Sequence, residues 1–251
     1  MKQSLIIIAV VFSILIAGCS KDRAVGRPSS GVAEELFNMG REYYDAGKWS
    51  KAIKVFTEFT MSYPFHDKVA EGSFLLAQSY FNNEDYQLAA GEYRRLIRRF
   101  SQSEYAEKAE LMLAESYLAS APNLALEQKD VERALELFRD FITYRPKSEF
   151  IEQARDGVRR CRERLAEKEY RTVELYYKLR KPESAVLYAD LLAEEFDGTS
   201  WVSEALLIKG KCLFDQLDQP DEAKKVFELV VEKYPKTKAA EEAISYLKKI
   251  G

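Results

Sequence analysis

The chain has 251 residues, of which 47% are apolar and 31% charged, and its formal net charge is −3 at pH 7. Its 11 glycines and 7 prolines are too few for a disordered or loop-rich protein of this length. Because the 38 basic and 41 acidic residues are interleaved rather than gathered in blocks, the composition disfavours nucleic-acid binding, and we expect no nucleic-acid partner.

The first segment, residues 1–18, predicts an export signal. Lys2 precedes an uncharged apolar run that ends in the letters IAGC at residues 16–19. These four letters resemble the lipobox of bacterial lipoproteins, in which the cysteine sulfur receives the lipid. We therefore expect lipid attachment at Cys19 and a flexible tether over 19–32, which is rich in Gly, Pro and Ser. The alternatives are an ordinary secretory signal or a short membrane anchor that happens to contain a cysteine.

From residue 33 the apolar spacing is helical almost throughout, and small and aromatic residues recur in a fixed order. A small residue on one helix is followed by an alanine on the next, by an aromatic residue four positions later, and by a residue that closes the unit. In chain order these sets are Gly40, Ala52, Phe56 and Pro64; Ala77, Ala89, Tyr93 and Ser101; Ala114, Ala134, Phe138 and Pro146; and Gly210, Ala223, Phe227 and Pro235. The pattern resembles the tetratricopeptide repeat, a pair of antiparallel helices in about 34 residues. The sequence therefore predicts an all-α solenoid.

Five helix pairs and a closing helix are predicted. Their boundaries are 33–66, 70–103, 107–148, 166–199 and 203–237, with the closing helix over 239–250. The fourth unit is degenerate, with Val173 where a small residue usually stands and Ala185 as its alanine. The third unit has a lengthened loop between its helices. A single helix over 148–179, about 48 Å long, is predicted to bridge the third and fourth units.

Gly40 stands inside the first predicted helix, where alanine would be more stable by about 1 kcal/mol. Packing within the predicted helix pair can explain why a glycine stands at this position. With Ala52 it lets the two helices approach closely, while Tyr43 and Phe56 fill the space beside them. We therefore expect Gly40→Leu to destabilise the pair and Gly40→Ala to be tolerated or stabilising.

Two cysteines follow Cys19, namely Cys161 and Cys212, and they lack CxxC or metal-site spacing. Buried or half-buried thiols are the favoured interpretation, and a disulfide is the alternative. His66 is the one histidine, and no metal-binding or catalytic motif is recognisable. The sequence therefore predicts a binding protein rather than an enzyme, with no cofactor apart from the covalent lipid.

One candidate binding surface is the side of the solenoid formed by the first helix of each pair. Extended or helical peptides usually bind there. In units one and two this side is predicted to be aromatic, with acidic residues Glu34 and Glu71 among the aromatic positions. Alternatively, these aromatic residues contact neighbouring helices and belong to the core. The candidate groove residues for a substrate peptide are Phe37, Arg41, Tyr44, Tyr63, Phe65, Phe74, Gln78 and Phe81.

A second candidate surface is the charged face of the long bridging helix. Arg155, Arg159 and Arg162 are predicted to dock an acidic partner. The alternative is a solvated helix face whose charges pair with one another. Such pairs would be Asp156 with Arg160 and Arg159 with Glu163.

Several features together resemble the BamD family, also called ComL or YfiO, over essentially the whole chain: the lipobox, the short tether, five repeats, the insertion in the third, YPF at 63–65, and RLAEKEYRTVELYYKLRKPESAV at 164–186. The resemblance implies a lipoprotein scaffold of the outer-membrane protein assembly (BAM) complex, on the periplasmic face of the outer membrane. It implies that repeats 1–3, residues 33–148, receive unfolded outer-membrane proteins. It also implies that residues 149–251 contact the barrel-forming core subunit, which has periplasmic repeat domains, and other assembly lipoproteins.

Two other classes of protein are alternatives to this interpretation. A different periplasmic tetratricopeptide lipoprotein, acting in pilus assembly or in coordinating wall synthesis with envelope division, would share the lipobox and the repeats. It would lack the inserted third unit and the YPF closure. An envelope hydrolase is disfavoured because no catalytic constellation is present. Ser20, rather than an aspartate, follows Cys19, which favours the outer membrane.

Overall fold

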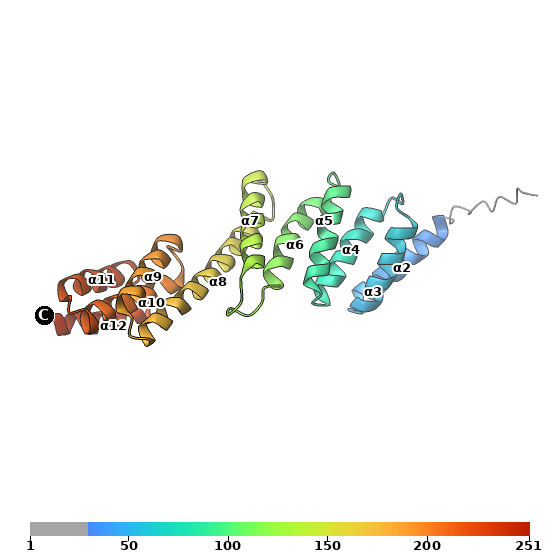
Figure 1. Cartoon of the computed structure of the whole chain (residues 1–251). Helices are drawn as coiled ribbons and strands as arrows, with labels where there is room; N and C mark the ends of the chain where they lie inside the picture. The colour runs from blue at the N-terminus through green and yellow to red at the C-terminus, as the bar shows by residue number, and fades with distance from the viewer. Residues whose placement is uncertain (1–29) are drawn as a thin grey trace, which may run out of the picture.

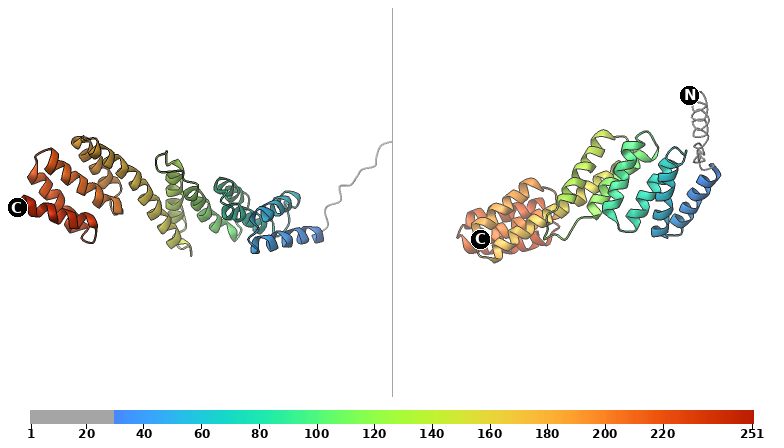
Figure 2. Two further views of the ribbon diagram at one scale, coloured as in Figure 1. Left: turned by 90° about the horizontal axis from the view of Figure 1, so that it is seen from below. Right: turned by 45° about the vertical axis from the view of Figure 1, so that its right-hand side comes forward.

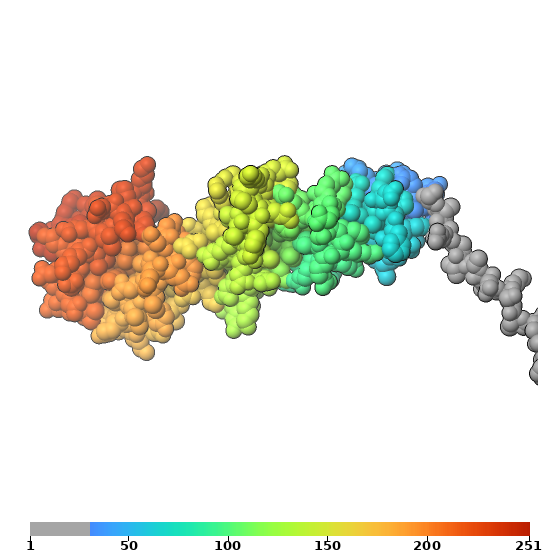
Figure 3. All heavy atoms as spheres, turned by 90° about the horizontal axis from the view of Figure 1, so that it is seen from above, coloured from blue at the N-terminus to red at the C-terminus, as the bar shows by residue number. Residues whose placement is uncertain are grey.

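The computed structural model describes residues 30–251, so the predicted export signal, the lipid attachment at Cys19 and most of the predicted tether lie outside the described residues. The described chain is all-helical, with eleven α-helices and one π-helical segment along an elongated molecule (Figure 1, Figure 3). Their bounds are α2 Ser30–Asp45, α3 Trp49–Ser62, α4 Val69–Asn82, α5 Tyr86–Arg99, α6 Tyr105–Ala119, α7 Lys129–Tyr144, α8 Ile151–Lys178, α9 Pro182–Glu195, α10 Ser200–Lys211, η1 Cys212–Gln216, α11 Pro220–Lys233 and α12 Lys238–Ile250.

The helices form antiparallel pairs, each packed against the next in chain order (Figure 1, Figure 2). The pairs are α2 with α3, α4 with α5, α6 with α7, α8 with α9, and α10 with α11, and α12 closes the array. First helices of neighbouring pairs also touch, as α2 touches α4 and α4 touches α6, whereas the second helices α3, α5 and α7 make no comparable contacts with one another. The first helices therefore lie closer together and line the inner side of the array. The predicted all-α tetratricopeptide solenoid is confirmed.

Apart from the start of the fourth unit at 166, which lies inside α8, the predicted repeat boundaries agree with the observed helices to within a few residues. The first helix begins earlier than predicted, at Ser30, so the end of the predicted tether is helical. The bridging helix α8 is shorter than predicted, with 28 residues. It begins only at Ile151, because the Ser148 hydroxyl accepts a hydrogen bond of 3.0 Å from the Phe150 N–H and holds a turn there. The helix ends before Arg180, whose φ of 54° is left-handed.

The recurring residues of the sequence pattern form the core of the solenoid. Each predicted alanine and each aromatic residue four positions later is fully buried where two helices of a pair meet. These residues are Ala52, Ala89, Ala134 and Ala223, with Phe56, Tyr93, Phe138 and Phe227. In the degenerate fourth unit Val173 and Ala185 are buried as well, which confirms the register assigned to that unit.

The glycines of the first helices lie directly under aromatic rings of the second helices. A Cβ atom at Gly40 would come within 2.8 Å of the Phe56 ring, and one at Gly210 within 2.4 Å of the Phe227 ring. The close approach predicted at Gly40 is therefore present. The expectation that alanine is tolerated there is disfavoured, because the ring occupies the space that the methyl group needs and is itself fully buried.

Helix α8 belongs to two hydrophobic cores. Ala154 and Cys161, near its start, are buried with the side chains of α6 and α7. Ala166 and Val173, further along, are buried with α9, α10 and α11. Leu165, between the two sets, packs against both cores. One continuous helix thus joins the N-terminal repeats to the C-terminal repeats (Figure 1).

The insertion in the third unit is an ordered loop between α6 and α7. Gln128, which is 1% exposed, donates from its amide nitrogen to the carbonyl oxygens of Asn123 at 3.1 Å and Leu126 at 3.0 Å. Its amide oxygen accepts a hydrogen bond of 2.9 Å from Nε of Arg164 on α8. The loop is therefore fastened to the bridging helix through a buried amide.

Candidate peptide-binding face and docking helix

The inner side of the first two repeats carries an ion pair between neighbouring first helices. Nη1 of Arg41 on α2 lies 2.6 Å from Oε1 of Glu71 on α4. The Arg41 side chain is exposed, so solvent or a bound peptide can reach its remaining guanidinium N–H groups. The pair fixes one cation on this face without burying it.

Half-buried aromatic residues continue this face along α4 and α6. The Phe74 ring lies 5.9 Å from the Tyr93 ring and 5.5 Å from the Tyr105 ring. Burial, followed by the charge of Glu71, raises the pKa of the Tyr105 hydroxyl. Tyr105 therefore stays a neutral hydrogen-bond donor on a surface that joins apolar rings to charged groups.

Three further predicted groove residues are also half-buried. Tyr44 packs edge-on against the Trp49 ring at 5.4 Å, and Phe81 packs against the Tyr86 ring at 5.3 Å. The Gln78 amide oxygen accepts a hydrogen bond of 3.1 Å from the Tyr93 hydroxyl. These side chains therefore support the helix pairs on one side and leave a partly open surface on the other.

Phe37 does not line an open groove, contrary to the prediction. It is 1% exposed, and its ring centroid lies 6.0 Å from that of Phe56 and 5.4 Å from that of Phe59. The ammonium group of Lys68 covers the ring at 4.8 Å. The side chain points into the interface with α3, so Phe37 is a core residue.

Tyr63 and Phe65 lie apart from the α2 and α4 side chains of the inner face, on the turn between α3 and α4. Tyr63 packs near Phe59, with ring centroids 6.0 Å apart, whereas Phe65 is 94% exposed. The carbonyl oxygen of Pro64, between them, accepts a hydrogen bond of 3.2 Å from Arg99 at the end of α5. The turn therefore belongs to the edge of the solenoid where the second helices end.

On the bridging helix, Arg155 and Arg159 are exposed and pair with carboxylates of the same helix. Arg155 lies 2.7 Å from Glu152, and Arg159 lies 2.6 Å from Asp156. The predicted pair of Asp156 with Arg160 is present at 2.8 Å. Exposed pairs of this kind contribute little to stability, so these arginines can exchange their partners for those of another protein.

Arg162 is engaged differently from the other two arginines. It donates a hydrogen bond of 2.9 Å to the carbonyl oxygen of Asp197 and lies 5.8 Å from the Phe196 ring. The predicted pair of Arg159 with Glu163 is absent, because Glu163 accepts hydrogen bonds from the Ser200 N–H at 3.1 Å and from the Ser200 hydroxyl at 2.7 Å. Glu163 and Arg162 therefore fasten α8 to the turn before α10.

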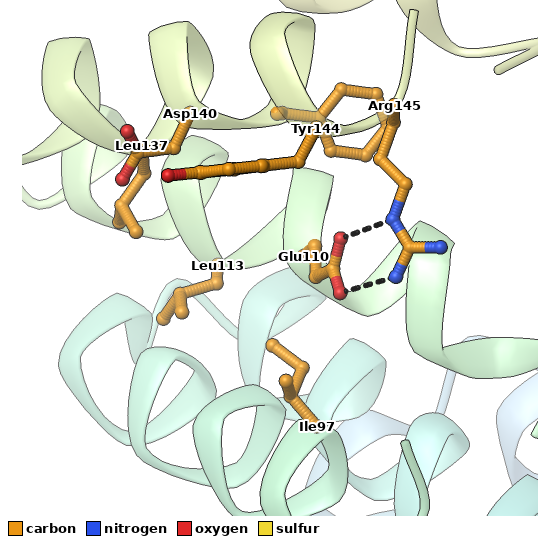
Figure 4. Close-up of a pocket in the computed structure, with 8 residues that line it drawn as sticks. Ile97, Glu110, Leu113, Leu137, Asp140, Tyr144 and Arg145 are labelled. Atoms are coloured by element: carbon orange, nitrogen blue, oxygen red, sulfur yellow. Dashed lines mark hydrogen bonds and ion pairs between the residues drawn. The ribbon is translucent and has the colours of Figure 1, made fainter. Parts of the chain in front are cut away.

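A pocket that sequence reasoning missed lies between α5, α6 and α7 and has a volume of about 420 Å³ (Figure 4). Tyr144, 78% exposed, stands at its edge, and beside it Glu110 holds Arg145 through two contacts of 2.8 and 3.1 Å. In the sequence, its Tyr144 and Arg145 stand directly before Pro146, the residue that closes the third unit. The pocket is lined by Ile97, Glu110, Leu113, Leu137, Asp140, Phe141, Tyr144 and Arg145.

The two cysteines of the described chain belong to its hydrophobic cores. Cys161 and Cys212 are buried and unbridged, as favoured from the sequence. Burial raises the pKa of the Cys161 thiol to about 12 and that of the Cys212 thiol to about 11. Within residues 30–251 no group of His, Cys, Asp and Glu side chains is arranged to hold a metal ion, and no helix is long and apolar enough to cross a membrane.

These features define a tetratricopeptide-repeat solenoid, a class of protein that binds peptide segments along its surfaces. A model of the YfiO family, described as outer membrane lipoprotein, matches residues 30–226. The chain belongs to this family.

The chain is also similar to individual proteins and solved structures. The outer membrane protein assembly factor BamD of Caulobacter vibrioides is 24% identical over 210 residues, which cover 82% of this chain and 68% of the relative. Among solved structures, the TPR2AB domain of yeast Sti1 in its pHSP90 complex has a TM-score of 0.47 and 13% identity, covering 88% of this chain and 90% of that one. A TPR repeats protein of Bacteroides fragilis has a TM-score of 0.47 and 15% identity, covering 87% of this chain and 97% of that one.

Proposed function

We propose that this chain is a scaffold of outer-membrane protein assembly, held on the periplasmic face of the outer membrane by a lipid on Cys19. Membership of a family of outer membrane lipoproteins and similarity to an outer membrane protein assembly factor support this role. The observation on which the binding proposal rests is the inner face of the first two repeats, which carries half-buried aromatic side chains and an exposed arginine.

The inner face is proposed to bind an extended segment of an unfolded β-barrel protein. Phe74 and Phe81 offer apolar ring surface, and aromatic side chains with arginines usually supply most of the energy of such contacts. Arg41 can bind a peptide carboxylate through the guanidinium N–H groups that Glu71 does not use. A segment that alternates aromatic and polar residues and ends in a carboxylate fits these groups.

Photo-crosslinking tests the inner face. A photoreactive residue at Tyr44, Phe74 or Phe81 should capture a synthetic peptide that copies the terminal β-strand of a barrel protein. The same residue at Lys54 on α3 or Glu136 on α7, both exposed on second helices, is the matched control and should capture little. Equal capture from both sides would mean that the peptide binds elsewhere.

The C-terminal repeats are proposed to contact the barrel-forming core subunit through the exposed arginines of α8. Arg155→Glu with Arg159→Glu should weaken co-purification of that subunit, while the helical circular-dichroism signal stays unchanged because both side chains are exposed. Arg162 is left intact, since its hydrogen bond to the Asp197 carbonyl supports the fold. A complex that survives the double reversal at physiological salt would leave these arginines as a solvated helix face.

The lipid anchor has its own test. Cys19→Ala should abolish incorporation of radiolabelled palmitate and release the chain from the membrane fraction, because this cysteine is the proposed attachment atom. The folded repeats should be unaffected, since the substitution lies outside residues 30–251. Unchanged labelling of the variant would contradict the anchor.

A further inference from the structure

The last two turns of α5 carry an unusual set of arginines. Of the arginines of this helix, only Arg95 has a carboxylate partner within residues 30–251, namely Glu92. Two others donate to neutral acceptors, as Arg99 does to the Pro64 carbonyl oxygen at 3.2 Å. Arg98 is exposed and has no hydrogen-bond or ion-pair partner among the described side chains. The four arginines of this helix are Arg94, Arg95, Arg98 and Arg99.

Two large apolar side chains are exposed beside these arginines. Phe65 is 94% exposed and Met61 is 73% exposed. Met61 and Pro64 line a shallow hollow of about 190 Å³ together with Arg95 and Arg99, so the turn after α3 and the end of α5 form one surface. We call this surface the arginine edge; it consists of Met61, Phe65, Arg95, Arg98 and Arg99.

Helix stability alone does not explain the arginine edge. Basic residues in a last turn do favour the negative end of the helix dipole. That effect does not account for the exposed phenyl ring of Phe65 on the neighbouring turn. On α8, by contrast, the exposed arginines Arg155 and Arg159 each pair with a carboxylate of their own helix. In the arginine edge only Arg95 has such a partner, Glu92, whereas Arg98 and Arg99 pair with no carboxylate of the described chain, and apolar side chains lie beside them.

We propose that the arginine edge rests on the anionic lipid surface of the membrane in which the chain is anchored. Arginine guanidinium groups bind phosphate oxygens in pairs, and an exposed phenyl ring is stabilised at the boundary between headgroups and acyl chains. Arg95 and Arg99 both line the hollow beside them, so two guanidinium groups border one space.

Chain length places the arginine edge within reach of the bilayer. This step rests on the proposed lipid anchor. Eleven peptide steps separate Cys19 from Ser30 (30 − 19 = 11), where the first helix begins. Even fully extended they span at most about 40 Å, and the same first repeat carries Met61 and Phe65. A surface held this close binds at high effective concentration, so a few charges suffice to orient the repeats against the membrane.

Site-specific fluorescence tests the proposal on the lipidated chain. Phe65→Cys, labelled with an environment-sensitive fluorophore, is reconstituted into vesicles of phosphatidylglycerol and phosphatidylethanolamine that contain a spin-labelled quencher lipid. Cys161 and Cys212 are buried and do not compete for the label. Lys236→Cys is the matched control, because Lys236 follows Pro235 in the corresponding turn of the fifth repeat. We expect quenching at position 65 and little at position 236.

Lipid charge and protein charge should both control the quenching at position 65. In phosphatidylcholine vesicles it should be largely lost. Arg98→Glu changes the net charge of the arginine edge by two units. Because each basic charge near an anionic membrane raises the binding affinity about fivefold, the variant should bind the membrane about 25-fold more weakly. Lys248→Glu, an equal change on the exposed side of α12, should leave docking unchanged.

Any of the following results would contradict the proposal that the arginine edge binds anionic lipid. A label at position 65 that stays in water in anionic vesicles, or that is quenched equally in neutral vesicles, excludes recognition of lipid charge. A label that becomes buried only when an assembly protein is added identifies the arginine edge as a protein-docking surface. Mass spectrometry separates these results from failure of the anchor: an unacylated Cys19 overturns both proposals, whereas an acylated chain with a solvent-exposed label overturns this one alone.

Discussion

Gly40→Ala is expected to destabilise the first repeat, although alanine is the better helix former. A methyl group at position 40 would lie 2.8 Å from Cε1 and 3.0 Å from Cδ1 and Cζ of Phe56. The ring cannot move away freely, because Phe56 is fully buried and packs against Phe37. Overpacking of this kind destabilises a protein by about 1–3 kcal/mol, whereas the higher helix propensity of alanine relative to glycine stabilises the helix by about 1 kcal/mol. We expect a net loss of up to about 2 kcal/mol and a melting temperature lower by up to roughly 8 °C.

Two further substitutions test whether contact with the Phe56 ring causes the loss of stability in Gly40→Ala. Gly91→Ala adds the same methyl group to α5, where a Cβ atom meets nothing within 4 Å, and should stabilise the chain by about 1 kcal/mol or less. Combining Gly40→Ala with Phe56→Leu should cost less than the sum of the two single changes, because the smaller side chain relieves the contact. Thermal melts followed by circular dichroism measure all four proteins. If Gly40→Ala is as stable as Gly91→Ala, the close contact between α2 and α3 does not exist.

Three other substitutions or conditions test the remaining structure. Phe37→Ala should cost about 3–5 kcal/mol of unfolding free energy in urea titrations, whereas a groove residue would change peptide binding with little loss of stability. Gln128→Leu should leave the Asn123 and Leu126 carbonyl groups without their donor, cost about 1–3 kcal/mol, and accelerate proteolysis within 121–127. Cys161, whose thiol pKa is raised by burial from 9.0 to about 12, should not react with a disulfide reagent at pH 8 until the chain unfolds. Because the unfolded thiol ionises first, its contribution to stability is complete below pH 9 and should be lost between about pH 9 and 12.

The helix pairs could be predicted because the repeat imposes the same packing several times. Alanine and phenylalanine recur four positions apart, as Ala52 and Phe56 do, and each set falls where two helices meet. Because the same pattern occurs in several units, an atypical unit can be aligned with the others. The fourth unit was aligned correctly in this way, although Val173 stands where a small residue is usual. The start of α2 was predicted less well, since the composition of residues 30–32 resembles a linker while the structure continues the helix through them.

The exposure of single aromatic residues could not be predicted in the same way. Phe37 and Phe74 lie on first helices and were assigned to one face, yet the first is enclosed by Phe56 and Phe59 while the second stays half-buried. The difference depends on rings that neighbouring helices contribute, and helical periodicity carries no information about them. The partner of Glu163 was missed for the same reason, because Ser200 is 37 residues away.

Helix α8 determines how this protein can be divided into stable fragments. A cut at residue 148, the predicted boundary between the N-terminal and C-terminal repeats, would remove Ala154, Gly157 and Cys161 from the surface that they cover. The Phe138 ring, which lies within 2.5 Å of the position a Cβ atom of Gly157 would take, would then face water. An N-terminal fragment must therefore keep α8 as far as Leu165, and a C-terminal fragment must keep Leu165, Ala166 and Val173. Because Leu165 packs against both cores, any single cut in α8 removes it from one of them, so the protein cannot be divided into two non-overlapping fragments without exposing apolar side chains.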